Sequence, residues 1–215
     1  AGLERDAAIA GLRALETEAL SCADLSDHER RSLLFTLSSV MINLASDARD
    51  IDGLVSGIEW ATRLMLDDEA PAILVPQAAY NRANGLLELF QIEESASHES
   101  PIPISSPSYR LDHLDGLQEP RVLFRLVGHD PSAPAEVRGR ALCNLGNVLD
   151  ESGRWTEAYA AYSDALRVDP SNGNAAGNLA ELLRRRLAGR VDQRGHLAAV
   201  YDRYVTLAKS LRDRT

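Results

Sequence analysis

Several kinds of residue are scarce in this sequence, and each shortage excludes a class of structure or function. Aromatic residues make up only 5% of the chain and runs of Val and Ile are sparse, which argues against a β-rich fold. The two cysteines, Cys22 and Cys143, form no CxxC motif, so we expect two reduced, buried thiols rather than a zinc site. No apolar run approaches the ~18 residues of a membrane span, so we expect no membrane association.

Motifs of catalysis and cofactor binding are also missing. The sequence contains none of the patterns GxSxG, GxGxxG, GxxxxGK[ST] or HExxH. Its five histidines are scattered without metal-ligand spacing, and the paired carboxylates Asp67 and Asp68 lie near an expected helix end. We therefore expect a protein that is not an enzyme and that uses no cofactor and no metal.

Lysine is almost absent, because Lys209 is the only one and every other basic residue is arginine. The net charge of −9 argues against general nucleic-acid binding. The charge is uneven, since residues 182–215 carry a net +6 and the preceding part carries −15. An alternative function, nucleic-acid binding, would therefore use this Arg-rich C-terminal segment.

Ala and Leu are abundant instead, which favours an all-helical protein. The most regular stretch covers residues 142–170 and reads LCNLGNVLDESGRWTEAYAAYSDALRVDP. Its apolar residues recur at helical spacing as far as Leu149, and Gly153 suits the turn that ends this helix. A second helix begins near Trp155 and ends before Pro170, because proline disfavours a helical residue ahead of it.

Small residues in this stretch have a packing reason. Gly146 on the first helix and Ala158 on the second allow two antiparallel helices to approach closely. Ala165 does the same toward the next helix pair. A single pair of this kind cannot bury its own apolar face and must stack on neighbouring pairs.

The stretch from Gly139 to Asn172 resembles a tetratricopeptide repeat and spans its full period of 34 residues. The positions that carry the resemblance are Leu142, Leu145, Gly146, Leu149, Gly153, Trp155, Ala158, Tyr162, Ala165 and Pro170. The resemblance implies an all-α fold, a right-handed superhelix of about four antiparallel helix pairs after one leading helix.

Fainter repeats flank this one. Advancing 34 residues from Asn144 leads to Asn178 in a similar context, and Asn43 and Asn81 hold comparable places earlier in the chain. We expect one domain over residues 1–215, with pairs at 24–70, 71–131 (containing an inserted Ser/Pro-rich loop at 94–110), 139–172 and 173–213.

The resemblance further implies a function, because tetratricopeptide proteins bind peptides along a groove lined by the first helix of each pair. An Asn side chain offers both a donor and an acceptor to the main chain of an extended peptide. The predicted peptide-binding residues are Asn144, Asn147, Asn178, Asn81, Asn84, Asn43, Arg140 and Arg185.

Other interpretations stay open for these residues. Each Asn could bond a neighbouring helix instead, and the arginines could be solvated helix ends. If the arginines do line the groove, they favour an acidic peptide or a free C-terminal carboxylate.

A second resemblance concerns the phrases YNRANGLLEL and LGNVLDESGRWTEAYAAYSDAL, which look like repeat regions that precede a HEPN ribonuclease domain in some bacterial proteins. Arg190 and His196 have the R-x5-H spacing of such nucleases, but Val191 stands where those enzymes carry a polar residue. The alternative function is then a sensor or regulatory module of a larger effector.

We expect a cytoplasmic bacterial scaffold whose partner is a protein or peptide. An uncapped repeat end would also allow pairing with a second copy of the chain.

Overall fold

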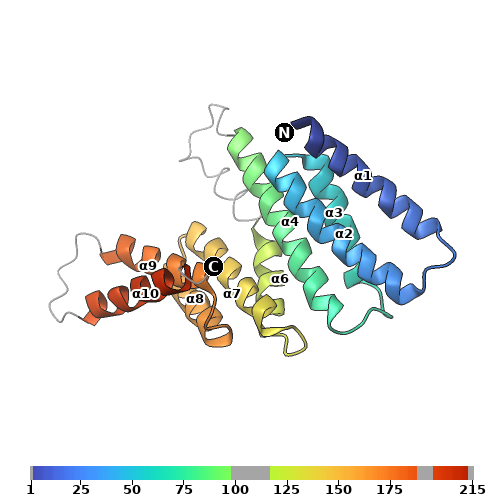
Figure 1. Ribbon diagram of the computed structural model, residues 1–215. Helices are drawn as coiled ribbons and strands as arrows, with labels where there is room; N and C mark the ends of the chain where they lie inside the picture. Colours follow the sequence, from blue (N-terminus) through green and yellow to red (C-terminus); the bar gives the residue numbers. More distant parts are fainter. Residues whose placement is uncertain (1, 98–116, 188–195, 213–215) are drawn as a thin grey trace. The chain divides into compact units, whose positions relative to one another are not determined.

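The computed structural model describes residues 2–97, 117–187 and 196–212, and these residues are all-helical (Figure 1). The described part contains nine helices and no strand. Successive helices pack together from α1 to α4 and from α7 to α10, as in a helical repeat array. The predicted all-α fold is confirmed. The chain divides into two compact units, unit 1 (Ala1–Leu123) and unit 2 (Phe124–Thr215).

Unit 1 begins with a helix that packs on the first helix pair. Helix α2 packs on α1, α3 and α4, and its start is fixed by a capping box between Ser26 and Glu29. Gly57 of α3 lies against α2, because a Cβ at this position would be 2.7 Å from Ile42 Cγ1. The helices are α1 (Gly2–Ser21), α2 (Asp27–Ala48), α3 (Ile51–Met65), α4 (Leu74–Ser97) and α6 (Gln118–His129), the last of which continues into unit 2.

Unit 2 holds the stretch with the strongest repeat pattern. Its helices after α6 are α7 (Ala135–Glu151), α8 (Trp155–Val168), α9 (Gly173–Leu187) and α10 (His196–Arg212). Gly153 adopts φ +73° in the turn between α7 and α8, a conformation that favours glycine. Asn172 caps α9, because its side-chain oxygen accepts a bond of 2.9 Å from the Ala175 N–H.

The core of unit 2 lies between these helices. Leu142 and Leu149 of α7, Tyr162 of α8, and Leu179 and Leu182 of α9 are at most 2% exposed. Gly146 makes this packing possible, since a Cβ there would overlap the Tyr162 ring.

Most element bounds agree with the periodicity of the sequence, but the expected loop at 94–110 begins too early. Helix α4 continues to Ser97, so residues 94–97 are helical. Ser95 Oγ donates to the Gln91 carbonyl oxygen at 2.5 Å, a bond made within the helix. The Ser and Glu residues here permit helix, and the next proline in the sequence, Pro101, comes only after them. The rest of the expected loop and Arg190 lie outside the described residues.

Within the described helices, none combines the length and apolar character needed to cross a membrane.

Replacing Gly146 with Ala should lower the free energy of unfolding by about 1–3 kcal/mol, because the new methyl group would press into the Tyr162 ring. Gly177→Ala in α9 is the matched control, since nothing lies within 4 Å of its Cβ position. That control should raise the free energy of unfolding by up to about 1 kcal/mol through helix propensity. Urea unfolding measures both, and equal effects of the two variants would contradict the packing assignment.

Candidate functional site

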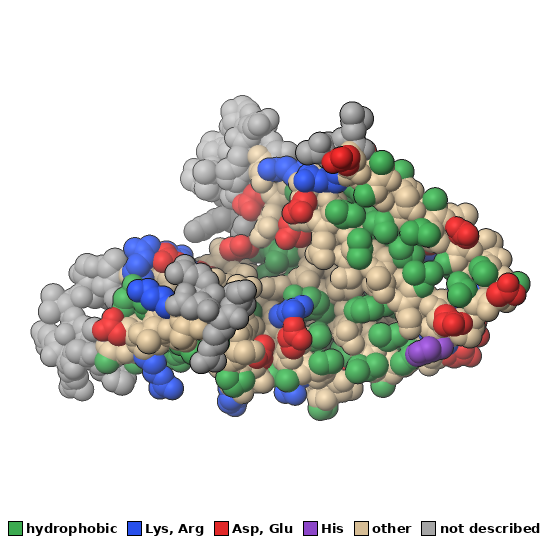
Figure 2. All heavy atoms as spheres, viewed as in Figure 1, with side chains coloured by type: hydrophobic (Ala, Val, Ile, Leu, Met, Phe, Trp, Pro, Cys, Tyr) green, Lys and Arg blue, Asp and Glu red, His purple; other side chains and the backbone are tan. Residues whose placement is uncertain are grey.

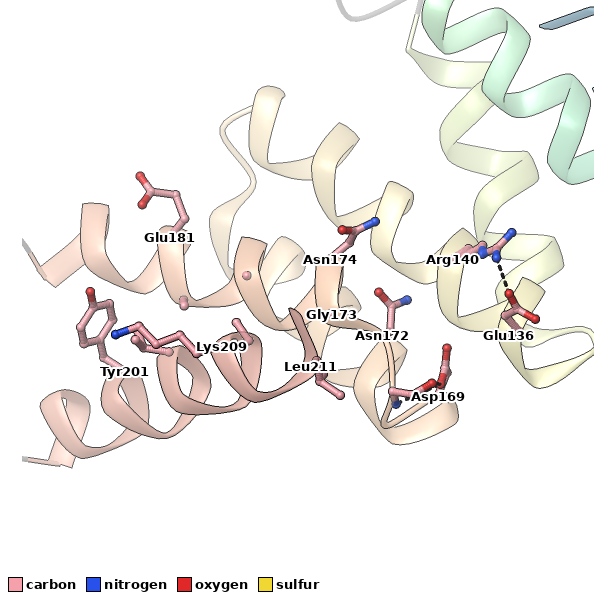
Figure 3. Close-up of a pocket in the computed structure, with 15 residues that line it drawn as sticks. Glu136, Arg140, Asp169, Asn172, Gly173, Asn174, Glu181, Tyr201, Lys209 and Leu211 are labelled. Carbon is pink, nitrogen blue, oxygen red and sulfur yellow. Dashed lines mark hydrogen bonds and ion pairs between the residues drawn. The ribbon is translucent and has the colours of Figure 1, made fainter. Parts of the chain in front are cut away.

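Helix α9 forms a shared wall between a small and a larger cavity in the described part of unit 2. A small cavity of about 160 Å³ lies over α7, α8 and α9. A larger cavity of about 770 Å³ is bounded by α9, α10 and the first turns of α7 (Figure 3). The small cavity is lined by Asn147, Asp150, Glu151, Tyr162, Asn178, Glu181 and Arg185.

A polar network joins three helices beside the small cavity. Asn147 Oδ1 accepts one bond from the Tyr162 hydroxyl and one from Asn178 Nδ2, each 2.8 Å long. Tyr162 is 2% exposed, and burial raises the pKa of its hydroxyl, which therefore stays protonated and donates. The two bonds fix the orientation of the Asn147 amide. Among the described residues, none bonds Asn147 Nδ2 or Asn178 Oδ1.

Cys143 lies next to this network as a buried thiol. The residue is 3% exposed, and burial raises the pKa of its thiol to about 11. Asn178 Nδ2 lies 3.7 Å from its sulfur. Cys22 is also a free thiol but is half-buried, so the expectation of two buried thiols is wrong for Cys22, which directly follows α1.

The arginine run 184–186 is paired with acidic side chains inside unit 2. Arg184 lies 2.6 Å from Glu181, and Arg185 pairs with Asp150. The Arg186 guanidinium lies 5.8 Å from the centre of the Trp155 ring and 4.0 Å from Asp150. In Figure 2, acidic and basic side chains are interspersed on the visible face of this unit. The run therefore presents less positive charge than its sequence indicates.

Comparison with known families addresses the stretch that contains this network. A family model described as tetratricopeptide repeat matches residues 139–172. Residues 139–172 form a tetratricopeptide repeat. Asn147 and Tyr162 belong to this repeat, and Asn178 lies on the helix that follows it. The resemblance to repeat regions of HEPN proteins stays a prediction. We found no curated protein that matches the chain.

The tetratricopeptide repeat and the helix after it bring together part of the predicted site. Asn147, Asn178 and Arg185 line the small cavity. Arg140 lines the larger cavity and forms an ion pair with Glu136, one turn earlier on α7. Asn144 is half-buried on the same helix.

The remaining predicted residues belong to unit 1. Asn43 is exposed on α2, and Asn84 is half-buried on α4. Asn81 is only 7% exposed, and its Nδ2 donates to Ser38 Oγ at 3.2 Å. Ser38 in turn donates to the Phe35 carbonyl oxygen, so the Asn81 amide is used inside the unit to join α4 to α2. Peptide contact by any of the eight residues stays a prediction.

Sequence reasoning missed two polar roles. The Tyr162 hydroxyl that orients Asn147 was expected only as part of the packing, because no local pattern joins residues on two helices. Asn172, which lines the larger cavity and caps α9, does carry a sequence signal, since Asn directly before a helix is a preferred cap.

Replacing Tyr162 with Phe should keep the ring on Gly146 and remove only its bond to Asn147. We expect a loss of about 1 kcal/mol in the free energy of unfolding. Tyr159→Phe on the exposed side of α8 is the matched control and should have no measurable effect. Urea unfolding of both variants checks this, and equal stabilities would show that the Tyr162–Asn147 bond is worth nothing to the fold.

Cys143 should react far more slowly than Cys22 with iodoacetamide at pH 8, because its thiol is both buried and protonated at that pH. Peptide mapping after timed labelling measures the two rates. Labelling in denaturant should remove the difference. Equal native rates would contradict the burial of Cys143.

Proposed function

We propose that the α7–α9 face of unit 2 binds the main chain of an extended segment of a partner protein. The tetratricopeptide repeat by itself indicates a protein-interaction scaffold, and such repeats are typically non-catalytic. Our more specific proposal is that the bound segment is extended and that its main chain contacts side chains of this face.

The observation that supports it is the orientation of two neighbouring amides. Asn147 Oδ1 is occupied by Tyr162 and Asn178, which leaves the Asn147 Nδ2 donor for a ligand. Asn178 Nδ2 donates to Asn147 Oδ1 and to Cys143 Sγ, so both of its N–H groups point into the unit and its oxygen remains as an acceptor. A main chain in extended conformation supplies a carbonyl oxygen for the first group and an N–H for the second. The internal bonds hold both amides in place, which lowers the entropy lost on binding.

The charges around these amides indicate what charge the bound partner segment should carry. Asp150, Glu151 and Glu181 line the small cavity together with one arginine, Arg185. Arg185 is already paired with Asp150, and Arg140 of the larger cavity with Glu136. These pairs remove the reason to expect an acidic peptide or a terminal carboxylate. A neutral or basic segment fits this surface better.

The alternative of nucleic-acid binding has less support than peptide binding. Each arginine of the run 184–186 has an acidic side chain within 4.0 Å. A phosphate would have to compete with these carboxylates for the same guanidinium groups.

We also propose that the helix pairs of unit 1 are degenerate repeats of the same kind. The Ile42 side chain of α2 packs directly against the backbone of Gly57 on α3, just as the Tyr162 ring of α8 packs against the backbone of Gly146 on α7. We further propose that the protein is cytoplasmic and that it can assemble with a second copy of itself.

The sharpest test replaces Asn147 with Asp, which keeps the oxygen that accepts from Tyr162 and Asn178 but turns the free donor into an acceptor. The probe is a set of peptides selected on the native full chain from a displayed random library without helical scaffold. We expect at least tenfold weaker binding by fluorescence anisotropy, because a ligand carbonyl would lose its donor.

The control is Gln118→Glu, which adds the same charge at an exposed amide of α6 that lines neither cavity. This variant should bind the peptides nearly as well as the native chain. The proposed function is wrong if no peptide is selected, or if Asn147→Asp and Gln118→Glu bind equally.

A further inference from the structure

The side chain of Asn172, between α8 and α9, is buried and has one hydrogen-bonding group without a partner. Its oxygen caps α9, but its Nδ2 is bonded to no group in the described part of the chain. The residue is only 9% exposed. Buried donors in folded proteins are nearly always paired, because an unpaired one costs free energy. A ligand that supplies an oxygen would remove this cost, so the Asn172 amide is suited to bind one.

Asn172 belongs to the lining of the 770 Å³ cavity. Its Nδ2 lies on the side of α7, since a Cβ on Gly139 would be 3.5 Å from it. In Figure 3 the amide lies between the start of α9 at Gly173 and Arg140 of α7, which lines the same cavity. The unpaired donor is therefore placed at the end of the cavity where α7 and α9 begin.

The start of α9 adds two donors beside this amide. The first N–H groups of a helix have no carbonyl oxygen within their own helix, and the positive end of the helix dipole lies there. The Ala175 N–H is bonded to Asn172, whereas the N–H groups of Gly173 and Asn174 have no partner among the described residues. Gly173 and Asn174 both line the cavity. This end of the cavity thus offers three N–H donors to one ligand.

The charges of the lining determine which kind of oxygen fits these donors. The charged residues of the lining are three acidic ones, Glu136, Asp169 and Glu181, and two basic ones, Arg140 and Lys209. Arg140 is already paired with Glu136, and Asp169 Oδ1 accepts from the Ser171 N–H at 3.0 Å. A carboxylate or phosphate would therefore meet a surplus of negative charge. A neutral carbonyl oxygen satisfies the donors without this repulsion.

The amide site of the proposed function lies a short distance along α9. Asn178 follows Asn172 by six residues, which corresponds to about 9 Å along a helix axis. An extended chain covers this distance in about three residues. Glu181 lines both cavities, so the two surfaces adjoin. One extended segment is therefore long enough to lie on both.

We propose that the segment bound at Asn147 and Asn178 continues into the larger cavity, where one of its main-chain carbonyl oxygens accepts from Asn172 Nδ2 and from the N–H groups at the start of α9. This inference rests on the proposed function and extends it to a second point of contact. The carbonyl group lies about three residues from the part of the segment that the two amides hold. Since every residue has a carbonyl group, this contact fixes the position of the segment and does not select its side chains.

The experiment uses two replacements of Asn172 that remove its Nδ2 donor and keep the cap of α9, because Ser and Asp are both preferred caps. Asn172→Ser is neutral, and Asn172→Asp adds a negative charge. Gln118→Glu is the control for the added charge, since it lines neither cavity. The peptides selected on the native full chain are measured by fluorescence anisotropy. Urea unfolding verifies that each variant folds, and Asn172→Ser decides the test if the buried charge of Asn172→Asp prevents folding.

We expect Asn172→Ser to weaken binding at least fivefold, Asn172→Asp to weaken it further, and Gln118→Glu to leave it nearly unchanged. Peptides shortened one residue at a time from each end give a second measurement. Once the part in the larger cavity is removed, a peptide should bind the native chain and Asn172→Ser equally, while Asn147→Asp still weakens its binding. Equal binding of the unshortened peptides to the native chain and Asn172→Ser overturns the proposal.

The contact at Asn172 and the proposed function fail in different ways. If Asn147→Asp weakens binding and Asn172→Ser does not, only the contact at Asn172 is wrong. If Asn172→Ser weakens binding and Asn147→Asp does not, the proposed function is wrong, and with it the single segment over both cavities. Replacing the acidic residues of a peptide by their amides and amidating its C-terminus tests for a carboxylate. If these changes remove the effect of Asn172→Ser, a carboxylate binds there and the main-chain contact is overturned.

Discussion

The contact of the Tyr162 ring with Gly146 sets the geometry of the tetratricopeptide repeat. Because Gly146 has no side chain, α7 and α8 approach closely and the ring lies directly on the α7 backbone. At this depth the hydroxyl reaches Asn147, the next residue of α7, and the Asn147 oxygen also holds Asn178 of α9. One steric condition thus determines how the repeat packs, how α9 is attached to it, and which way an amide beside the cavity is turned.

The charged residues of unit 2 act mainly on one another. Asp150 is shared by Arg185 and Arg186, and Glu181 by Arg184 and Arg185. The pairs of Glu181 are exposed on both sides and contribute little to stability, since water and salt screen them, whereas the Asp150 side chain is only 13% exposed. The consequence of these pairs for recognition is larger, because they remove most of the free positive charge from the Arg-rich end of α9. The α7–α9 face of unit 2 can then select a partner mainly through its oriented amides and its shape.

Helix α9 serves both cavities because successive residues of an α-helix point about 100° apart. Asn178 faces α7 and lines the small cavity, whereas Gly177 lines the large one beside α10. Glu181 lies between these directions and lines both. A single helix therefore contributes to two separate cavities: a small polar one over α7 and α8, and a larger one beside α10 whose lining mixes apolar and polar side chains.

The sequence by itself determined the helices of this protein, because helix-forming patterns and stop signals are local. The turn at Gly153, the end before Pro170 and the start of α9 after Asn172 were readable from a few neighbouring residues. The amide site was only partly readable: the repeat spacing selected Asn147 and Asn178, but it also selected Asn81, whose amide is bonded inside unit 1. Only the tertiary structure decided which amides keep a free group and which helical glycine has open space at its Cβ position. Both depend on what a residue of another helix places opposite, and that contact between distant residues is absent from any local pattern.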